Sequence, residues 1–504
     1  MDFRRVLPWS VAALLAPLYA AVSLTRHGRL ESAGFDLGIF EEAVRAYARL
    51  EAPVVALKGT GFNLLGDHFS PVLAVLAPFY RLWPGAGTLL VAQAVLVALS
   101  AVPVTGYAVR VLGPAGGAVA GVAYGLSAGL QSAVAFDFHE VAFAVPLAAA
   151  AVVALARERY GPAVAWALPL LLVKEDQALL VAAVGGYVWW RGRRRLGAVT
   201  VLAAVAAGLL VTLVVIPALN PGGEYTYGHM GEYGGGNPLV RLLFPAVKAL
   251  TVLLLLAPTL LLALRSPLVL LAGVLLAARF WVDNPAFWRT GQHYDAVLVP
   301  LLCTAGLHGA GLLLPRLSRL SRLGRGLPVA AGMLAVTVAL TATGPVAGVL
   351  AGDAWRGDGR AAQVRRVLAV VPDGARVAAA NRLAPQLTGR CTVSLFPYLT
   401  PPGGPGGAGG PGGWGRPVAE WVAVLEEPDG FPVPVAEQRR FLAGLVDGGG
   451  YRRVADGAGW SVRSRSRRAA SSRWFSSPRC GVVPTAPRKY LDVTMLTALT
   501  DQNS

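Results

Sequence analysis

Apolar runs of near-spanning length alternate with short polar gaps along the first 350 residues of the chain. A helix of about 20 apolar residues is long enough to cross a bilayer. The runs cover residues 7–24, 88–111, 115–135, 141–156, 161–173, 177–190, 197–217, 244–264, 267–282, 294–315 and 328–350. This pattern predicts a transmembrane domain over residues 1–350 with about eleven transmembrane helices. The first outer loop covers residues 25–87, and residues 70–83 form an interfacial or re-entrant helix within it.

The polar gaps differ in charge, and every second gap is basic. The basic gaps contain Arg110, Arg157, Arg159, Arg191, Arg193, Arg194, Arg195, Arg265, Arg316, Arg319, Arg322 and Arg325. Arginine-rich loops stay on the cytoplasmic side of a membrane. We therefore expect a multi-pass protein of the bacterial cell membrane with a cytoplasmic N-terminus. Its first run is too long for the core of a signal peptide and is interpreted as a retained anchor.

Beyond Gly352 the pattern changes to that of a small mixed domain. Short strands and then an amphipathic helix are indicated at 375–380, 392–399, 421–427 and 435–447. We predict an extracytoplasmic α/β domain over residues 351–463, with a flexible Gly/Pro-rich insertion at 401–415. Residues 464–504 are predicted to be a disordered basic tail. The predicted fold class is an α-helical polytopic membrane protein with this small α/β domain at its C-terminal end.

Composition supports the membrane assignment. Of 504 residues, 55% are hydrophobic and 14% are charged, and the mean hydropathy is +0.54. A soluble domain carries about 25% charged residues. The net charge of +17 does not indicate a nucleic-acid partner, because the arginines lie in short gaps where they set topology. Cys303, Cys391 and Cys480 have no spacing typical of a disulfide framework or a metal site.

The remaining gaps hold nearly all the carboxylates and histidines of the transmembrane part. These gaps are residues 35–50, 66–71, 136–140, 174–176, 222–236 and 288–295. A charge at the centre of a bilayer costs roughly 2.5–3.5 kcal/mol on insertion scales. We therefore expect these ionisable groups to lie together at the extracytoplasmic ends of the helices.

Asp36 stands directly before a helix-like stretch in the first outer loop. One interpretation is a helix N-terminal residue favoured by the helix dipole, with Glu41 and Glu42 on a solvated face. The other is a carboxylate that projects toward a reaction centre as a general base. The spacing alone leaves both open.

The next two gaps also allow a structural and a functional interpretation. In "GDHFSP", Asp67 or Ser70 could cap a helix, or Asp67 and His68 could contact a metal or phosphate. Adjacent residues rarely face the same way, so the pair is a weak metal candidate. In "FDFHE", Asp137 and Glu140 are three residues apart and share a face if helical. Together with His139 they exceed the polarity that a turn requires.

Two further gaps add a lysine and several aromatic residues. Lys174 could pair with Glu175 or Asp176 and serve structure alone, or it could bind phosphate as a compact charge. The last group consists of Tyr225, Tyr227, His229, His293 and Tyr294. Aromatic residues at a membrane interface need no function, but these would also suit stacking on a sugar.

Taken in order, five segments resemble a known family. "FDLGIFEEAV", "GDHFSPVL", "FDFHEVAFAVPL", "LLLVKEDQAL" and "QHYDAVLVP" are similar to the bacterial membrane family called domain of unknown function 2079. The resemblance is strong over about residues 30–305 and weaker in "RLAPQLTGRCTVSLFPYL". This family is distantly similar to the polytopic glycosyltransferases of the GT-C fold, so a GT-C-like transmembrane core is implied.

The resemblance implies inverting transfer of a sugar from a polyprenyl-phosphate donor to an envelope glycan or protein at the outer membrane face. Asp36 would be the base, Lys174 or His68 would stabilise the departing lipid phosphate, and the "FDFHE" residues would orient the sugar or the base. The candidate catalytic residues are Asp36, Asp137 and Glu140, and the candidate substrate-binding residues are His68, His139, Lys174, Glu175, Asp176, His293 and Tyr294. Many GT-C enzymes carry adjacent acidic residues in the first loop. Here Leu37 and Gly38 follow Asp36, so no cofactor is defined and a divalent metal is not supported by that motif.

Two other classes of function remain open from the sequence. A transporter usually binds its substrate near the bilayer midplane, at breaks in two repeated halves. The charges here gather at one edge and no repeat is visible, which disfavours transport without excluding a lipid flippase. The third class is a non-catalytic membrane protein of envelope assembly.

Overall fold

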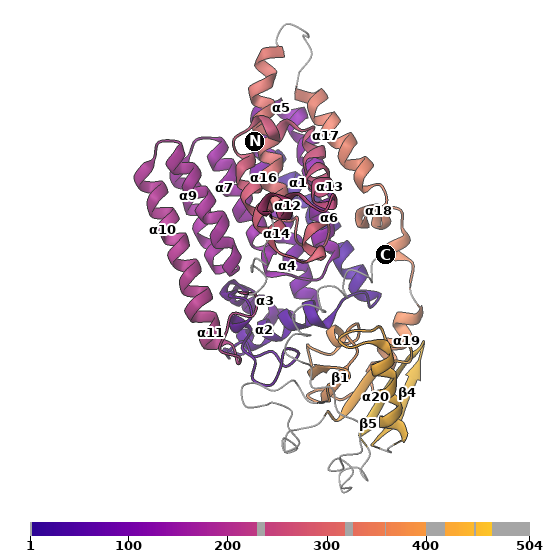
Figure 1. Cartoon of the computed structure of the whole chain (residues 1–504). Coiled ribbons are helices and arrows are strands. Elements are labelled where there is room, and N and C mark those ends of the chain that lie inside the picture. Colours follow the sequence, from indigo (N-terminus) through magenta and orange to yellow (C-terminus); the bar gives the residue numbers. More distant parts are fainter. Residues whose placement is uncertain are drawn as a thin grey trace.

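The computed structural model describes residues 3–228, 237–317, 326–357, 359–399, 419–447 and 450–465. Most of this part of the chain is helical, and a small sheet lies at one end of the helices (Figure 1). The helices before the sheet are α1 (Phe3–Gly28), α2 (Ile39–Ala48), α3 (Ala77–Leu82), α4 (Ala86–Leu99), α5 (Ala101–Gly125), α6 (Ala128–Ala135), α7 (Ala144–Ala156), α8 (Tyr160–Ala167), α9 (Ala178–Trp190), α10 (Arg194–Leu210), α11 (Ile216–Leu219), α12 (Pro238–Leu243), α13 (Val247–Leu256), α14 (Val269–Trp281), α15 (Pro285–Trp288), α16 (Leu298–Leu313), α17 (Gly326–Thr341) and α18 (Pro345–Leu350).

Within the described residues, three helical stretches are long and apolar enough to cross a membrane: Arg4–Gly28, Ala86–Gly125 and Arg194–Leu219. The other apolar helices have 10–17 residues, because 3-10 turns and prolines interrupt several of the predicted runs. The number of about eleven spans stays a prediction. The helical stretch Arg194–Leu219, which begins with α10, has an exposed flank of large apolar side chains, such as Leu202 and Leu213, which are each 68% exposed. Such a surface is typical of a lipid-facing helix.

Glycines allow the apolar helices to pack closely as antiparallel hairpins. In α5 the helix turns back at Gly113, whose φ of 79° suits glycine. A Cβ at Gly117 would lie 2.5 Å from the Val109 backbone, and one at Gly121 would lie 2.3 Å from the Thr105 hydroxyl. Small residues at such contacts let two membrane helices approach each other. The turn at Gly113 is also the boundary that the sequence predicted between runs 88–111 and 115–135.

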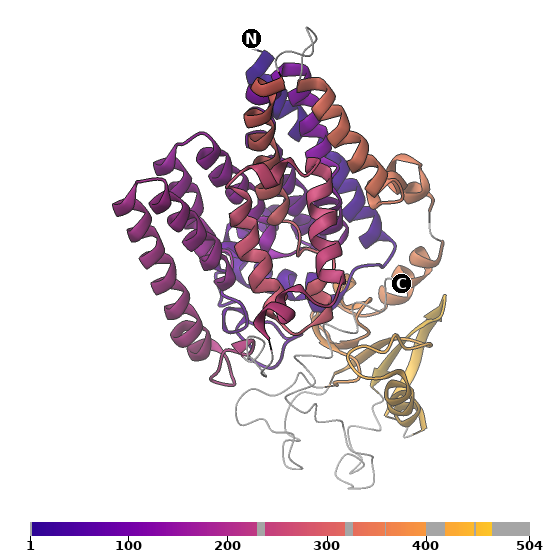
Figure 2. The same cartoon turned by 45° about the horizontal axis from the view of Figure 1, so that its top comes forward.

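The arginine-rich gaps meet at one end of the helices. Arg191, in the turn between α9 and α10, pairs with Glu158, in the turn between α7 and α8. Arg110 lies close enough to Arg157 to interact with it electrostatically. The views in Figures 1 and 2 place these turns at the end of the molecule opposite the sheet. The alternation of basic and acidic gaps thus corresponds to two opposite ends.

The C-terminal sheet has the order β2-β1-β3-β5-β4. Its elements are α19 (Gly359–Leu368), β1 (Arg376–Ala379), β2 (Thr392–Leu395), β3 (Trp421–Leu425), α20 (Val435–Asp447), β4 (Tyr451–Gly457) and β5 (Trp460–Arg465). β1 pairs in parallel with β2 and β3, whereas β5 is antiparallel to β3 and β4. The three predicted strands and the helix at 435–447 are present. The predicted start of the tail at residue 464 is wrong, because β5 continues to Arg465; residues 466–504 and the insertion 401–415 lie outside the described residues.

The two helices of this domain cover opposite faces of its sheet, because strand residues alternate between the faces. Val377 and Val462 share a core with Val364 of α19, whereas Ala378 and Val422 share another with Leu445 of α20. The first core extends without a break into the first outer loop. It includes Leu37 and Phe40 beside Leu383 and Leu387. The sheet domain is therefore packed onto the loop that contains Asp36.

Candidate functional site

Asp36 lies in a π-helical turn, Gly34–Gly38, that the C-terminal domain holds in place. The backbone N–H of Gly34 donates to the Asn381 carbonyl at 2.8 Å, and that of Phe35 donates to the Asn381 side-chain oxygen at 2.9 Å. Gly34 allows this approach, because a Cβ there would lie 2.4 Å from the Ala384 Cβ. A segment beyond residue 380 thus holds this turn in place.

The Asp36 carboxylate has one engaged and one open oxygen. Oδ1 lies 3.5 Å from Nε2 of His139, and the Asp36 side chain is 14% exposed. Oδ2 is buried and has no hydrogen-bond partner within the described structure. A buried carboxylate oxygen without a donor is costly to maintain, and such a group is available to accept a proton.

The "FDFHE" segment is fixed by hydrogen bonds from two other elements. Gln93 of α4 accepts from the His139 backbone N–H at 3.0 Å and donates to the Ala133 carbonyl at 3.0 Å. The Asp137 carboxylate accepts from the Ala33 backbone N–H at 2.6 Å. Burial and the nearby charge of Asp36 raise the pKa of Asp137 to about 7. Asp137 therefore links the segment that follows α6 to the start of the first outer loop.

His139 lies between two carboxylates, Asp36 at Nε2 and Glu140 at Nδ1, the second at 2.9 Å. Burial by itself would lower the pKa of His139, but the charges and hydrogen bonds of the two carboxylates raise it to about 9. The ring of His293 stacks on it with centroids 3.7 Å apart. Burial and the charge of His139 hold the pKa of His293 well below its ordinary value. At neutral pH the charged imidazole of His139 thus stacks on the neutral imidazole of His293.

Glu140 links His139 to Lys174 of the "KED" segment. Its side chain is completely buried and lies 2.9 Å from both Lys174 Nζ and His139 Nδ1. A buried charge is retained at this cost only when it is paired, and Glu140 balances two cations. Of the interpretations that the sequence left open for Lys174, the ion pair with Glu175 or Asp176 is not the one that forms, since Lys174 pairs with Glu140.

A second pair of ionic contacts lies beside the first. His68 Nδ1 is 2.7 Å from Glu175 Oε1, to which the Tyr225 hydroxyl also donates at 3.3 Å. The ring of Tyr227 stacks on His68 with centroids 4.5 Å apart. The Tyr227 hydroxyl donates to Asp67 at 3.2 Å. Tyr225 and Tyr227 therefore contact residues of the site, although an aromatic belt would also explain their position in the sequence.

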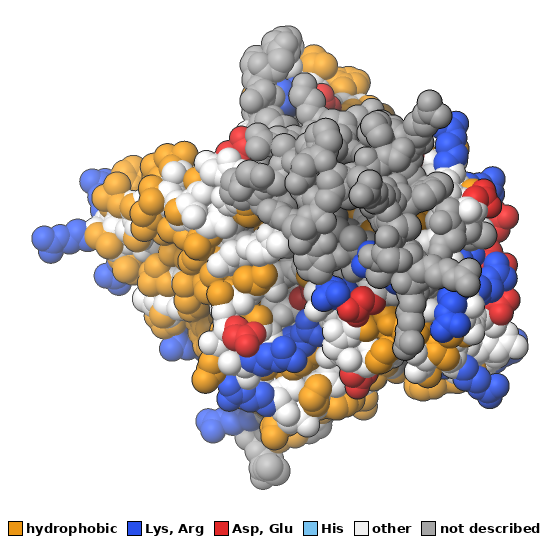
Figure 3. All heavy atoms as spheres, turned by 90° about the horizontal axis from the view of Figure 1, so that it is seen from below, with side chains coloured by type: hydrophobic (Ala, Val, Ile, Leu, Met, Phe, Trp, Pro, Cys, Tyr) orange, Lys and Arg blue, Asp and Glu red, His pale blue; other side chains and the backbone are white. Residues whose placement is uncertain are grey.

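Lys58 is the last member of this group of ionisable side chains, through its ion pair with Asp67. Its Nζ lies 2.9 Å from Asp67 Oδ2 and 5.0 Å from the ring centroid of Phe35, the residue before Asp36. Burial raises the pKa of Asp67, but Lys58, His68 and the Tyr227 hydroxyl together outweigh burial, and the pKa falls below its ordinary value. We call this connected series of neighbouring ionisable side chains the polar ring; its members are Asp36, His139, Glu140, Lys174, Glu175, His68, Asp67 and Lys58. The end view in Figure 3 shows acidic and basic side chains on this face, beside a flank of hydrophobic ones.

The residues of the polar ring do not form an evident metal site. Asp67 faces Lys58, whereas His68 faces Glu175, so the two weak metal candidates have separate partners. No group of three or more His, Cys, Asp or Glu side chains within the described ranges is arranged to hold a metal ion. The donors among the described residues therefore do not fit a divalent cofactor.

A family model for a predicted membrane protein, DUF2079, matches residues 26–401. The chain belongs to this family. The match includes the whole polar ring and the Asn381 contact, and it ends before β3. A search among curated proteins found no match. A similar solved structure is the crystal structure of ArnT from Cupriavidus metallidurans in the apo state, with 15% sequence identity and a TM-score of 0.45 over 93% of this chain and 100% of that chain.

In this DUF2079 protein, four of the predicted site residues are not members of the polar ring: Asp137, Asp176, His293 and Tyr294. Asp176 is exposed and accepts a hydrogen bond from Gln177 at 3.0 Å. Tyr294 packs against His293, with ring centroids 4.5 Å apart, and lies under Arg279. His229 lies outside the described residues.

The sequence analysis of this family member missed Lys58, Gln93 and Asn381. A signal for Lys58 was present, because only four of the 45 basic residues are lysines. In a chain that uses arginine almost everywhere, a lysine marks a position where a compact charge is needed. Asn381 carried no such signal, since its function depends on a contact between distant segments.

The expectation that Glu41 and Glu42 lie on a solvated face is wrong. Their exposed fractions are 1% and 2%. Glu41 accepts hydrogen bonds from the Thr388 hydroxyl at 2.5 Å and the Tyr80 hydroxyl at 3.1 Å, and Glu42 accepts one from the Leu57 backbone N–H at 3.2 Å. The C-terminal domain covers the face of α2 that amphipathic periodicity assigned to water.

Proposed function

We propose that this protein is an inverting glycosyltransferase that moves a sugar from a polyprenyl-phosphate donor to a cell-envelope glycan or protein at the outer membrane face. The observation that carries the proposal is the Asp36 carboxylate, which has one oxygen beside a cationic His139 and a second without a donor. General-base catalysis requires an ionised oxygen that can reach the proton of the attacking group. Family membership and the gathering of ionisable groups at one end of the helices support the same assignment.

In the proposed reaction, the acceptor hydroxyl oxygen forms a bond to the anomeric carbon. The bond from that carbon to the phosphate oxygen breaks, and its electron pair leaves with the lipid phosphate. The hydroxyl proton moves to Oδ2 of Asp36. His139 holds the other oxygen of the base, and its own second nitrogen is fixed by Glu140. This arrangement orients the base without consuming the oxygen that accepts the proton.

We assign binding of the departing phosphate to His68 and Lys58, in the half of the polar ring that also contains Glu175 and Asp67. The side chain of His68 is 20% exposed, against 12% for Lys174, which is fixed by the fully buried Glu140. His68 is therefore the more accessible donor, and Lys58 lies in the same half at 15% exposure. Positive donors aimed at a developing phosphate charge lower the barrier most effectively in a site that excludes water. His293, together with the tyrosines around His68, provides aromatic surface for the sugar.

The substitution Asp36→Asn tests the base, because it keeps the shape and removes the proton acceptor. Loss of a general base costs about 10²–10⁴-fold in rate. The assay uses the full chain in proteoliposomes with a panel of polyprenyl phosphate-linked hexoses and pentoses, and mass spectrometry follows donor loss and polyprenyl phosphate release. Asp283→Asn is the control, since Asp283 is exposed between α14 and α15. Equal turnover by both variants would exclude Asp36 as the base, and binding without donor consumption would favour a flippase.

The proposed orientation has its own test. Glu158 lies in an arginine-rich turn, and Glu224 directly precedes Tyr225, which contacts Glu175 of the polar ring; both glutamates are exposed. Glu224→Cys should react with an impermeant thiol reagent in intact cells, and Glu158→Cys should react only after permeabilisation. The other cysteines are replaced in both variants. The reverse labelling pattern would place the polar ring in the cytoplasm and rule out an outer-face reaction.

A further inference from the structure

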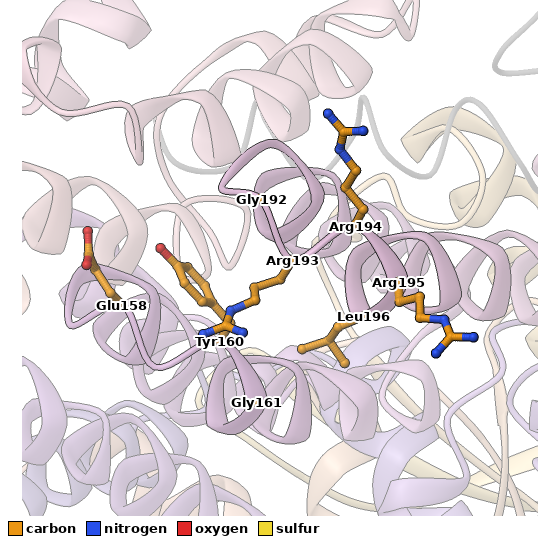
Figure 4. Close-up of a pocket in the computed structure, with 8 residues that line it drawn as sticks. All are labelled: Glu158, Tyr160, Gly161, Gly192, Arg193, Arg194, Arg195 and Leu196. Carbon is orange, nitrogen blue, oxygen red and sulfur yellow. The ribbon is translucent and has the colours of Figure 1, made fainter.

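A second candidate site lies at the arginine-rich end, away from the polar ring. A pocket of about 630 Å³ opens between the α7–α8 turn and the α9–α10 turn (Figure 4). Its lining consists of Glu158, Tyr160, Gly161, Gly192, Arg193, Arg194, Arg195 and Leu196. This volume lies within the range of small-molecule sites, about 300–1,000 Å³. The pocket is large enough for a polar head group.

The pocket carries uncompensated positive charge. The carboxylate of Glu158 is already paired with Arg191, which also donates to the Tyr160 hydroxyl at 3.3 Å. In Figure 4, Arg193 extends across the pocket toward Tyr160, and Arg194 and Arg195 stand at the rim. None of these three arginines forms an ion pair with an acidic side chain of the described segments. An anion would meet charge here without having to displace a carboxylate.

Backbone groups add to this attraction. α10 begins at Arg194, and no side chain caps the N-terminus of this 17-residue helix. The first N–H groups of a helix and its dipole favour an anion at that end. The guanidinium of Arg193 and the start of α10 therefore face the same space from two sides. Arginine with backbone N–H groups is a combination suited to phosphate.

The neighbouring side chains indicate the depth of the pocket in a membrane. Trp189 and Trp190, directly before the turn, are 52% and 58% exposed. Exposed tryptophans are enriched where lipid head groups meet water. Apolar exposure resumes in α10 at Val199 and Leu202, which are 64% and 68% exposed. The pocket thus lies between an aromatic boundary and a lipid-facing flank, at head-group level.

We propose that this pocket binds the phosphate of an anionic phospholipid from the adjoining leaflet. Arg193 contacts the phosphate, the rim arginines steer it, and the acyl chains lie along the apolar flank of α10. The site is independent of the reaction proposed at the polar ring. Arginines that only set topology remain solvated and show no preference for one lipid molecule, which distinguishes the two explanations.

The test compares Arg193→Gln with Arg110→Gln, which removes the same charge at the same end but outside the pocket. Full-length protein in phosphatidylcholine nanodiscs is titrated with phosphatidylglycerol, and bound lipid is counted by native mass spectrometry. We expect one saturable phosphatidylglycerol site, weakened about tenfold by Arg193→Gln, as for loss of one charge-assisted hydrogen bond, and unchanged by Arg110→Gln. Equal effects of both variants, or unsaturable binding, would overturn the proposal. Displacement of the lipid by millimolar inorganic phosphate would overturn the lipid as the ligand and assign the pocket to a free anion.

Discussion

The contact between α2 and the C-terminal domain should loosen as the pH rises. Glu41 and Glu42 are buried in this contact, where Thr388 and Tyr80 surround Glu41. Burial raises the pKa of each carboxyl from 4.5 to about 7. The docked state therefore binds more protons than a separated state in which water reaches both groups. Stability then falls with rising pH, and the loss is complete once the pH has passed about 7.

The size of the effect follows from these pKa values. One pKa unit corresponds to about 1.36 kcal/mol, so a single carboxyl makes docking about 2.5 kcal/mol less favourable at about pH 8 than at about pH 5. This difference is a factor of about 70 in the opening equilibrium. The two carboxyls are neighbours and repel each other when both are ionised, so the second adds to the effect in the same direction.

Hydrogen exchange measures this opening directly. The backbone N–H groups of Gly34 and Phe35 donate to Asn381 across the contact. Their protection against exchange, corrected for the intrinsic pH dependence of exchange, should fall by a factor of about 70 between about pH 5 and about pH 8. The double variant Glu41→Gln, Glu42→Gln should lose most of this dependence. An unchanged slope in the double variant, or protection that grows with pH, would refute the role of the two carboxyls.

Two further predictions concern single contacts. Gly34→Ala places a Cβ 2.4 Å from that of Ala384, so we expect about 1–3 kcal/mol of overpacking and faster proteolytic release of the C-terminal domain, whereas Gly28→Ala, with no atom within 4 Å, should match the wild type. Glu140→Gln leaves Lys174 buried without its carboxylate, and we expect about 3–5 kcal/mol of destabilisation in thermal unfolding. The double variant Glu140→Gln, Lys174→Met should recover part of this loss, and a double variant as unstable as the sum of both single variants would contradict the pairing.

Sequence patterns predicted the elements that depend on neighbouring residues. The short apolar run "WVAVL" predicted β3, amphipathic periodicity predicted α20, and the break at Gly113 separated two apolar runs. The gathering of polar gaps at one end also followed, because successive helices reverse direction and the charges alternate. The predicted groups His68, His139, Lys174 and Glu175 do lie in one connected set.

Patterns failed where a partner was distant in the chain. Glu41 and Glu42 have the spacing of a solvated face, but both are buried, and one partner of Glu41, Thr388, lies 347 residues away in the chain. The pairing of Lys174 with Glu140 rather than with its sequence neighbour has the same origin. The hairpin of β4 and β5 lies within the predicted α/β domain except for its last two residues, but its strands were not predicted, because their arginines and serines interrupt the apolar pattern of a strand.

The packing of the C-terminal domain on the first outer loop also fixes the order of events during biosynthesis. The turn at Gly34–Gly38 leaves the ribosome early, but Asn381, which binds its backbone, is synthesised more than three hundred residues later. Until that segment has been synthesised, Glu41 lacks its Thr388 partner and the turn that contains Asp36 lacks its Asn381 contacts. The position of Asp36 therefore depends on the C-terminal domain, whereas the contacts among the other seven members of the polar ring lie within residues 58–175.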